Sequence, residues 1–210
     1  MKRIRAHSIP FIENISKQQK RKAMPTPAGI FTDQEAREVL TEHEGILSLL
    51  PRVFTREKII LDLGCGMGYC CEHLKTEGYD VFGFEGTPAP ENRSQFSPIF
   101  TVNLIQPWWQ ILPQGQVLCL EVGEHIPKQY ESMILENISR PTAPGCHCLI
   151  SWAVEGQDGT GHVNCRNNDY IIEKMTNLGL EYQSKRTKEL REEFHDIYQN
   201  TLMLFRRIGS

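Results

Sequence analysis

The residues best suited to chemistry in this 210-residue chain stand at the ends of short apolar runs. One run, Ile59–Leu63, carries Asp62 and leads directly into three glycines on alternate positions, Gly64, Gly66 and Gly68. Glycine allows a tight turn in which the backbone approaches a ligand closely, and a helical pattern with free N–H groups at its start follows. A strand, a glycine turn and a helix together predict the nucleotide-binding corner of a doubly wound sheet.

A second acidic group, Glu85, ends the next apolar run and is followed by Gly86. An acid placed about 20 residues beyond the glycine turn can accept hydrogen bonds from both hydroxyls of a ribose. We therefore expect Glu85 and Gly86 to contact a nucleoside, with a surface glutamate at a strand end as the alternative. An acid at this place also fits an NAD site.

The glycine spacing separates the two cofactors. It differs from the dinucleotide pattern G-x-G-x-x-G, and it resembles motif I of the class I S-adenosylmethionine (SAM)-dependent methyltransferases. The resemblance implies that Asp62 holds the methionine ammonium, directly or through water, and that Cys65 contributes to the cofactor loop. It also implies that Asn103 and Leu104, after the third strand, contact the adenine; a turn-forming role for Asn103 is the alternative.

A third group of polar residues, Glu121, Glu124 and His125, follows another apolar run, with Val122 among them. Ligands of open α/β sheets bind at the carboxyl ends of strands, so these groups are expected beside the cofactor. The segment Leu118–Pro127 resembles the E-x-x-E-H-x-P stretch of small-molecule O-methyltransferases related to ubiquinone biosynthesis. That resemblance implies cofactor contacts from Glu121 and Val122, and catalytic roles for Glu124 and His125.

Three interpretations of this group remain open. In the related enzymes the corresponding two acids and the imidazole are proposed to hold a divalent metal next to the substrate hydroxyl. His125 is alternatively a general base, because the pKa of histidine lies near neutrality, or a structural residue that caps the next helix. We do not favour a metal.

The segment 154–168 follows the fifth strand and is rich in glycine. Binding residues concentrate in loops that a rigid scaffold positions. We expect His162 to act there as a general base or substrate ligand, with an incidental histidine in a flexible surface loop as the alternative.

Strands and helices alternate along the chain, which predicts a parallel sheet. The expected fold is α/β, a Rossmann-like doubly wound, mostly parallel sheet of seven strands with flanking helices. The expected strands are Ile59–Leu63, Asp80–Glu85, Pro98–Val102, Gln116–Glu121, His147–Ala153, Leu180–Ser184 and Thr201–Arg206, and the expected helices are Tyr69–Glu77, Lys128–Ser139 and Asn168–Leu178. A capping box at Thr32 predicts a further helix from Asp33 to about Leu49 that stops before Pro51.

Composition and charge limit the kinds of partner that we expect. We expect a basic N-terminal arm over residues 1–30 and one methyltransferase domain over 31–210. A net charge of only −3 gives no general electrostatic case for nucleic acid. Seven cysteines, an odd number without a C-x-x-C pair, indicate reduced thiols in a cytoplasmic protein, and prolines rule against a membrane span in the least charged stretch.

The sequence thus predicts transfer of a methyl group from SAM to an oxygen or nitrogen of a small molecule, leaving S-adenosylhomocysteine. The alternatives are an RNA or protein methyltransferase that uses the basic arm, and a non-catalytic SAM-binding module. The glycine spacing disfavours an NAD-dependent oxidoreductase.

Overall fold

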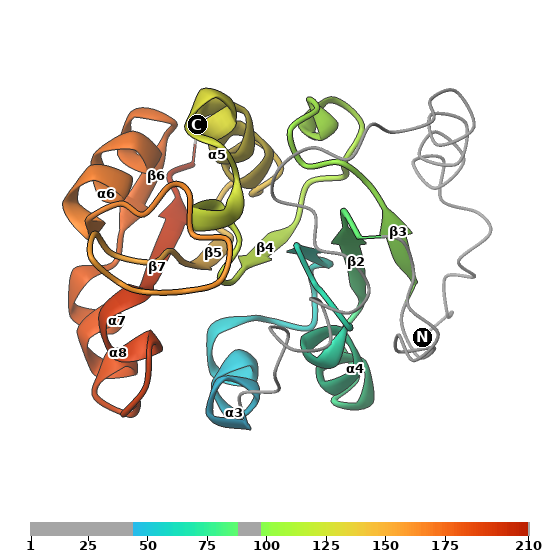
Figure 1. Cartoon of the computed structure of the whole chain (residues 1–210). Coiled ribbons are helices and arrows are strands. Elements are labelled where there is room, and N and C mark those ends of the chain that lie inside the picture. Colours follow the sequence, from blue (N-terminus) through green and yellow to red (C-terminus); the bar gives the residue numbers. More distant parts are fainter. Residues whose placement is uncertain (1–43, 88–97, 210) are drawn as a thin grey trace.

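A single seven-stranded sheet forms the centre of the computed structural model, which describes residues 44–87 and 98–209 (Figure 1). The strand order is β3-β2-β1-β4-β5-β7-β6. Strands β1 to β5 pair in parallel, whereas β7 is antiparallel to both of its neighbours. The strands are β1 (Ile60–Leu63), β2 (Val81–Glu85), β3 (Ile99–Thr101), β4 (Gln116–Cys119), β5 (His147–Ser151), β6 (Leu180–Tyr182) and β7 (Leu202–Arg207).

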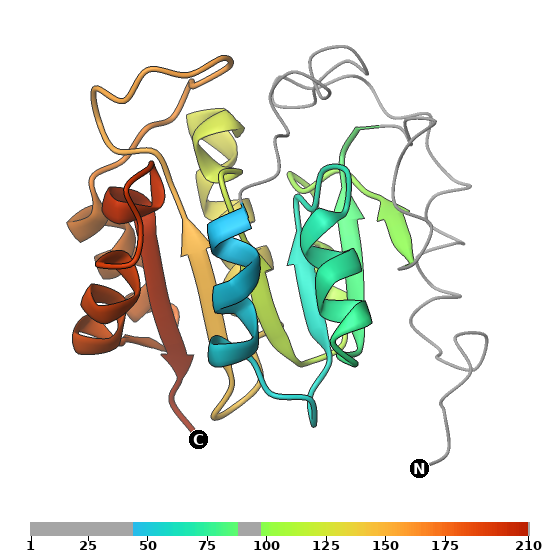
Figure 2. The same ribbon diagram turned by 90° about the horizontal axis from the view of Figure 1, so that it is seen from below.

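Helices cover both faces of the sheet (Figures 1 and 2). The helices are α3 (Glu44–Val53), α4 (Tyr69–Thr76), α5 (Glu131–Ser139), α6 (Asn168–Asn177), α7 (Ser184–Arg191) and the short α8 (Tyr198–Thr201). Two apolar clusters hold the layers together: one joins α5 and α6 to the sheet, and the other joins α3, α4 and α7 to the opposite face. The expected doubly wound α/β fold is therefore confirmed.

The predicted end of the first helix is wrong. Helix α3 continues through Pro51 to Val53 instead of stopping before the proline. Leu49, Leu50 and Val53 are all buried, and the hydroxyl of Tyr79 donates to the carbonyl oxygen of Pro51 at 3.2 Å. Burial of this apolar face outweighs the hydrogen bond that proline cannot donate. The expected start of this helix and the basic arm lie outside the described residues.

The predicted strands and the three helices between them form where the sequence places them, with shorter ends at the edge that carries the candidate site. β4 stops at Cys119 and not at Glu121, because Glu121 adopts a left-handed backbone conformation with φ of 53°. β5 likewise stops at Ser151. Both differences mark the places where the chain leaves the sheet to form loops.

Parallel pairing brings the loops after β1, β2, β3, β4 and β5 to one edge of the sheet. Because β7 runs in the opposite direction, helix α8, which directly precedes β7, also lies at this edge, and Ser151 at the end of β5 pairs with Leu202.

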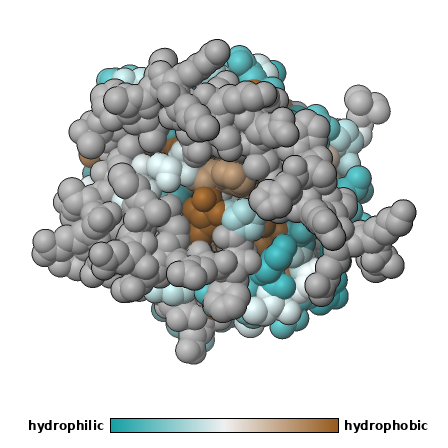
Figure 3. Space-filling model, turned by 90° about the vertical axis from the view of Figure 1, so that its right-hand side faces the viewer, coloured by the Kyte–Doolittle hydropathy of each residue, from teal (hydrophilic) through white to brown (hydrophobic). Residues whose placement is uncertain are grey.

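At the side of the molecule that carries β3, a half-buried edge strand, hydrophobic residues reach the surface beside hydrophilic ones (Figure 3). Within residues 44–87 and 98–209, none of the helices has the length and apolar character needed to cross a bilayer.

Candidate functional site

The glycine loop after β1 has the backbone conformation that its sequence predicts. Gly64, Gly66 and Gly68 have φ of 79°, 54° and 87°, the left-handed region in which a side chain is strained. Gly68 is also the residue before α4, so the loop ends at a helix N-terminus. A Cβ on Gly64 would lie 2.3 Å from Cγ2 of Val122, so the glycine loop packs directly against the loop that follows β4.

Glu85 holds this glycine loop in place. Its two carboxylate oxygens accept hydrogen bonds of 2.8 Å from the backbone N–H groups of Gly66 and Thr87. The sequence places Glu85 near the cofactor but does not reveal its bond to Gly66, because the two residues belong to different strand–loop units. Gly86, which stands between Glu85 and Thr87, is buried.

Asp62 is buried beneath the loop. Its Oδ2 accepts a hydrogen bond from the thiol of Cys71 at 3.2 Å. Burial raises the pKa of Asp62 to about 7, with a hydrogen bond from Cys71 opposing the rise and the charge of Glu85 adding to it. The carboxyl therefore titrates near neutrality, where the charge of a bound group decides its protonation.

Cys65 lies within the glycine loop with its sulfur against β2, where a Cβ on Gly83 would come within 2.7 Å of Cys65 Sγ. Asn103 follows β3 and is buried; its Oδ1 accepts the N–H of Ile105 at 3.2 Å, which is the turn-forming role that the sequence left open. Asn137 on α5 donates to the carbonyl oxygens of Leu104 and Gln106 at 2.7 Å each, and so fixes the segment after Asn103.

The loop after β4 combines strain with buried acid. Glu121, in its left-handed conformation, donates its N–H to Ser151 Oγ at 2.8 Å and accepts a hydrogen bond from Thr201 Oγ1 at 3.3 Å. Glu124 is fully buried, and neither of its carboxylate oxygens has a hydrogen-bond partner in the described part of the chain. Burial and then the charge of Glu121 raise the pKa of Glu124 well above its ordinary value, which favours the protonated form of this acid.

Two imidazoles meet beside this acid. The ring centroids of His125 and His162 lie 5.1 Å apart in an edge-on arrangement. Nδ1 of His125 contacts the carbonyl oxygen of Gly161 at 3.2 Å, and Nδ1 of His162 contacts that of Gln157 at 3.1 Å. Burial lowers the pKa of His125, the bond to the Gly161 carbonyl opposes this, and the charge of His162 lowers it further.

The segment between β5 and α6 is held by hydrogen bonds at several points. The N–H groups of Val163 and Asn164 both donate to the carbonyl oxygen of Glu124 at 2.9 Å. Trp152 donates its Nε1–H to the carbonyl oxygen of Asn164 at 2.7 Å, and its ring fills the space where a Cβ of Gly123 would be. These bonds place His162 over the loop that carries His125, which the sequence order alone does not show.

An ion pair that the sequence did not reveal closes the end of this segment. Arg166 Nε donates to Glu131 Oε2 at 2.6 Å, with only 14% and 9% of the two side chains exposed. The hydroxyl of Tyr170 donates to the other carboxylate oxygen, and the guanidinium lies over the Tyr170 ring at 4.8 Å. Burial would raise the pKa of Glu131, but the hydrogen bonds from Tyr170 and Arg166 outweigh it and lower the pKa.

A carboxylate and two imidazoles are close enough to share one ion. Ligand atoms of Glu124, His125 and His162 all lie within 4.8 Å of one another. The group differs from the set implied by the resemblance to ubiquinone-related enzymes, because His162 takes part and Glu121 does not. Two imidazoles with a carboxylate are a donor set that suits zinc and similar transition metals.

Comparison with known proteins adds to this geometry. A family model described as a methyltransferase domain matches residues 34–166, whereas no curated protein matches the sequence. A TehB-like SAM-dependent methyltransferase from Corynebacterium glutamicum shares 16% identity, covering 94% of this chain and 100% of that chain, with a TM-score of 0.59. Phosphoethanolamine N-methyltransferase 2 from Haemonchus contortus, in complex with phosphomonomethylethanolamine and S-adenosylhomocysteine, shares 15% identity over 80% of this chain and 52% of that chain, with a TM-score of 0.53.

A third structure limits what the fold alone can show. The [4+2]-cyclase SpnF has 11% identity, covers 95% of this chain and 93% of that chain, and has a TM-score of 0.57. At such low identities the likeness shows a shared fold, and function must be argued from the site. None of these similarities singles out the ubiquinone-related O-methyltransferases. Since the family model spans residues 34–166, more than half of the sequence, the chain belongs to the methyltransferase domain family.

Proposed function

We propose that this protein transfers a methyl group from SAM to an oxygen or nitrogen of a small-molecule acceptor. The observation that carries the proposal is the close packing of Gly64 on Val122. This contact sets the predicted cofactor loop beside the loop that bears Glu124 and His125. A cofactor held by the first loop would therefore lie next to the acid and the imidazoles of the second.

The residues of the first loop fit the cofactor. The glycines present backbone in a conformation that leaves room for a ligand, and Glu85, although both oxygens already accept one N–H group, retains lone pairs for ribose hydroxyls. The positive charge of a bound ammonium would lower the pKa of Asp62 below its present value of about 7, so the carboxyl would be ionised at neutral pH. Bound SAM supplies a methyl group on a sulfonium sulfur.

The proposed role of the two imidazoles is to remove the proton from the acceptor. A lowered pKa keeps His125 neutral at pH 7, which is the form that a general base needs. If Nδ1 of His125 donates to the Gly161 carbonyl, the lone pair stands on Nε2 and can take the proton. Glu124 is fully buried and lies within 4.8 Å of both imidazoles, so its proposed role is to position them.

The segment over the site supports a small acceptor. Val163 and Asn164 bond to the backbone of Glu124, so this segment lies against the β4 loop and would cover an acceptor bound beside the imidazoles. The rival RNA or protein substrate depends on the basic arm, which lies outside the described residues.

A metal-assisted reaction is the second candidate, favoured by the grouping of Glu124, His125 and His162 within 4.8 Å. The partnerless oxygens of Glu124 fit such a role, because an ion would compensate a buried carboxylate. Zinc titration of the metal-stripped protein separates the candidates. The metal would be favoured if wild type binds one equivalent of zinc, if each of the single variants His162→Asn and His125→Asn loses that binding, and if EDTA abolishes activity.

The cofactor is tested first by calorimetric titration with S-adenosylhomocysteine and with NAD. Wild type should bind the former and not the latter, and Glu85→Gln should weaken binding about tenfold, the effect of one charged hydrogen bond. Glu173→Gln, an exposed acid on α6, is the matched control and should bind like wild type. A folded protein that binds NAD but no S-adenosylhomocysteine would refute the proposal.

The reaction is then tested by following S-adenosylhomocysteine release with panels of phenols, carboxylic acids and amines. His125→Asn and His162→Asn should lower turnover while sparing cofactor affinity. His195→Asn, an exposed histidine before α8, is the control that should retain activity. Tight cofactor binding without turnover of any acceptor class would support the non-catalytic alternative.

A further inference from the structure

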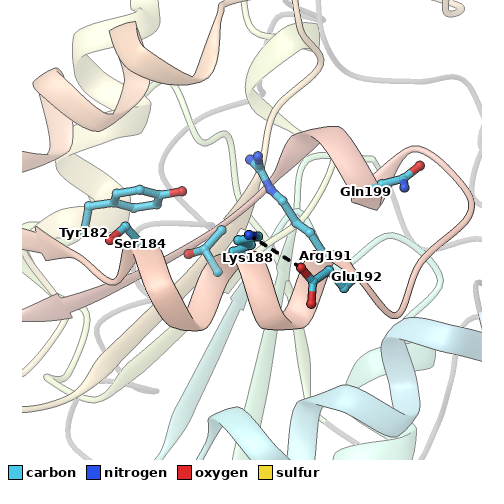
Figure 4. Close-up of a pocket in the computed structure, with 7 residues that line it drawn as sticks. Tyr182, Ser184, Lys188, Arg191, Glu192 and Gln199 are labelled. Atoms are coloured by element: carbon cyan, nitrogen blue, oxygen red, sulfur yellow. Dashed lines mark ion pairs between the residues drawn. The ribbon is translucent and has the colours of Figure 1, made fainter.

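A hollow lined by polar residues lies at the edge of the sheet that carries β6, where β6 ends and α7 begins (Figure 4). It has a volume of about 260 Å³ and is lined by Tyr182, Ser184, Thr187, Lys188, Arg191, Glu192 and Gln199. Four of these residues are three or four positions apart along α7, so they share one face of the helix. Tyr182 comes from β6, and Gln199 from α8.

Arg191 is the unusual group in this hollow. Its Nε donates to the carbonyl oxygen of Leu202 at 2.6 Å, which fixes the guanidinium at the start of β7. No carboxylate in residues 44–87 and 98–209 forms an ion pair with Arg191, and its Nη2 is buried without a hydrogen-bond partner. Burial lowers the pKa of Arg191 while the nearby Tyr182 opposes the effect, so the cation is poorly compensated where it stands. Half-buried cations are ordinarily paired, which points to an anionic ligand.

The surrounding groups define the chemistry of that anion. Lys188 adds a second cation, and its contact with Glu192 is long, at 3.9 Å, between side chains that are 80% and 65% exposed. Such an exposed pair contributes little and leaves the ammonium able to bind another anion. Tyr182 and Ser184 also line the hollow and each carries a hydroxyl, so the lining residues offer more hydrogen-bond donors than the two oxygens of a carboxylate can use.

We propose that this hollow binds the phosphate group of a small molecule, through the guanidinium of Arg191 and the ammonium of Lys188. Since Nε already donates to Leu202 and Nη2 is buried, Nη1 is the guanidinium nitrogen left to donate its two N–H groups to phosphate oxygens. The site is distinct from the proposed methyl-transfer site. Helix α8 lies between them, with Gln199 lining the hollow and Thr201 donating to Glu121.

Inorganic phosphate and glycerol 3-phosphate, titrated into the full chain at constant ionic strength, test the proposal without reference to methyl transfer. Wild type should bind one equivalent of either compound, and acetate should bind much more weakly. Arg191→Gln should weaken phosphate binding by about tenfold or more, and Lys188→Gln by a smaller factor. Lys185→Gln removes the same charge from an exposed position of α7 outside the hollow, and should bind like wild type.

Three results would overturn the assignment. These are the absence of phosphate binding to the folded wild type, equal losses with Lys185→Gln and Arg191→Gln, and acetate that binds as tightly as phosphate. Circular dichroism checks that Arg191→Gln is folded. If it is not, the exposed Lys188→Gln variant decides, because unchanged phosphate affinity in that variant also contradicts the proposal.

Discussion

We expect the buried ion pair between Arg166 and Glu131 to be the main side-chain interaction that stabilises the segment carrying His162. In Arg166→Met the side-chain volume is nearly kept, while the Glu131 carboxylate, 9% exposed, loses its cation and retains the hydroxyl of Tyr170. Breaking a buried pair costs about 3–5 kcal/mol. Because one hydrogen bond to the carboxylate survives, we expect a loss in the free energy of unfolding near the lower limit, about 3 kcal/mol.

Urea unfolding measures this loss, and a second ion pair supplies the control. Arg52 and Glu193 stand at the same N–O distance of 2.6 Å, but 55% and 44% of their side chains are exposed. Arg52→Met should therefore cost about 1 kcal/mol or less. The double variant Arg166→Met/Glu131→Gln should be more stable than Arg166→Met, since it removes the uncompensated charge.

The pH dependence gives an independent check. The pKa of Glu131 is lowered in the folded protein, so its contribution is complete above the ordinary value of 4.5 and is lost as the pH falls through the lowered value. In Arg166→Met the remaining burial favours the protonated acid. The stability difference between wild type and Arg166→Met should thus be widest above pH 4.5 and narrow below it. A difference that does not change with pH, or a cost equal to that of Arg52→Met, would refute this account.

Two further predictions concern the glycine loop and the imidazoles. Gly64→Ala should destabilise the protein by more than Gly156→Ala: both positions have positive φ, a strain of about 1–2 kcal/mol, but only the first new methyl group meets Val122, at 2.3 Å, whereas the second meets nothing within 4 Å. Equal costs in urea unfolding would contradict the close packing of the two loops. The pH profile of kcat/KM should keep its acid limb below 6.5, because the pKa of His125 is lowered and the base is lost only as the pH falls through that value; a limb above 6.5 that is unchanged in His125→Asn would assign it to another group.

The sequence predicts the sheet and the glycine loop well because their signals are local. Apolar runs bounded by glycine specify the strands, and the left-handed backbone at positions 64 and 68 strongly favours glycine there. The end of α3 was mispredicted for the opposite reason. Pro51 is a local stop signal, but Leu50 and Val53 are buried on the sheet and their packing decides the outcome.

The contrast between local signals and contacts between distant residues also explains which features of the candidate site the sequence does not predict. Asn103 was a single polar residue with two possible roles, and its bond to the next turn is equally local. The contact between His125 and His162, in contrast, joins loops from different strands, and depends on backbone bonds from Val163 to Glu124 that no periodicity encodes. Residue types at strand ends therefore name the groups that reach one edge of the sheet. Which groups touch is decided by how the loops cross, so the chemistry proposed here depends on contacts between loops more than on any motif.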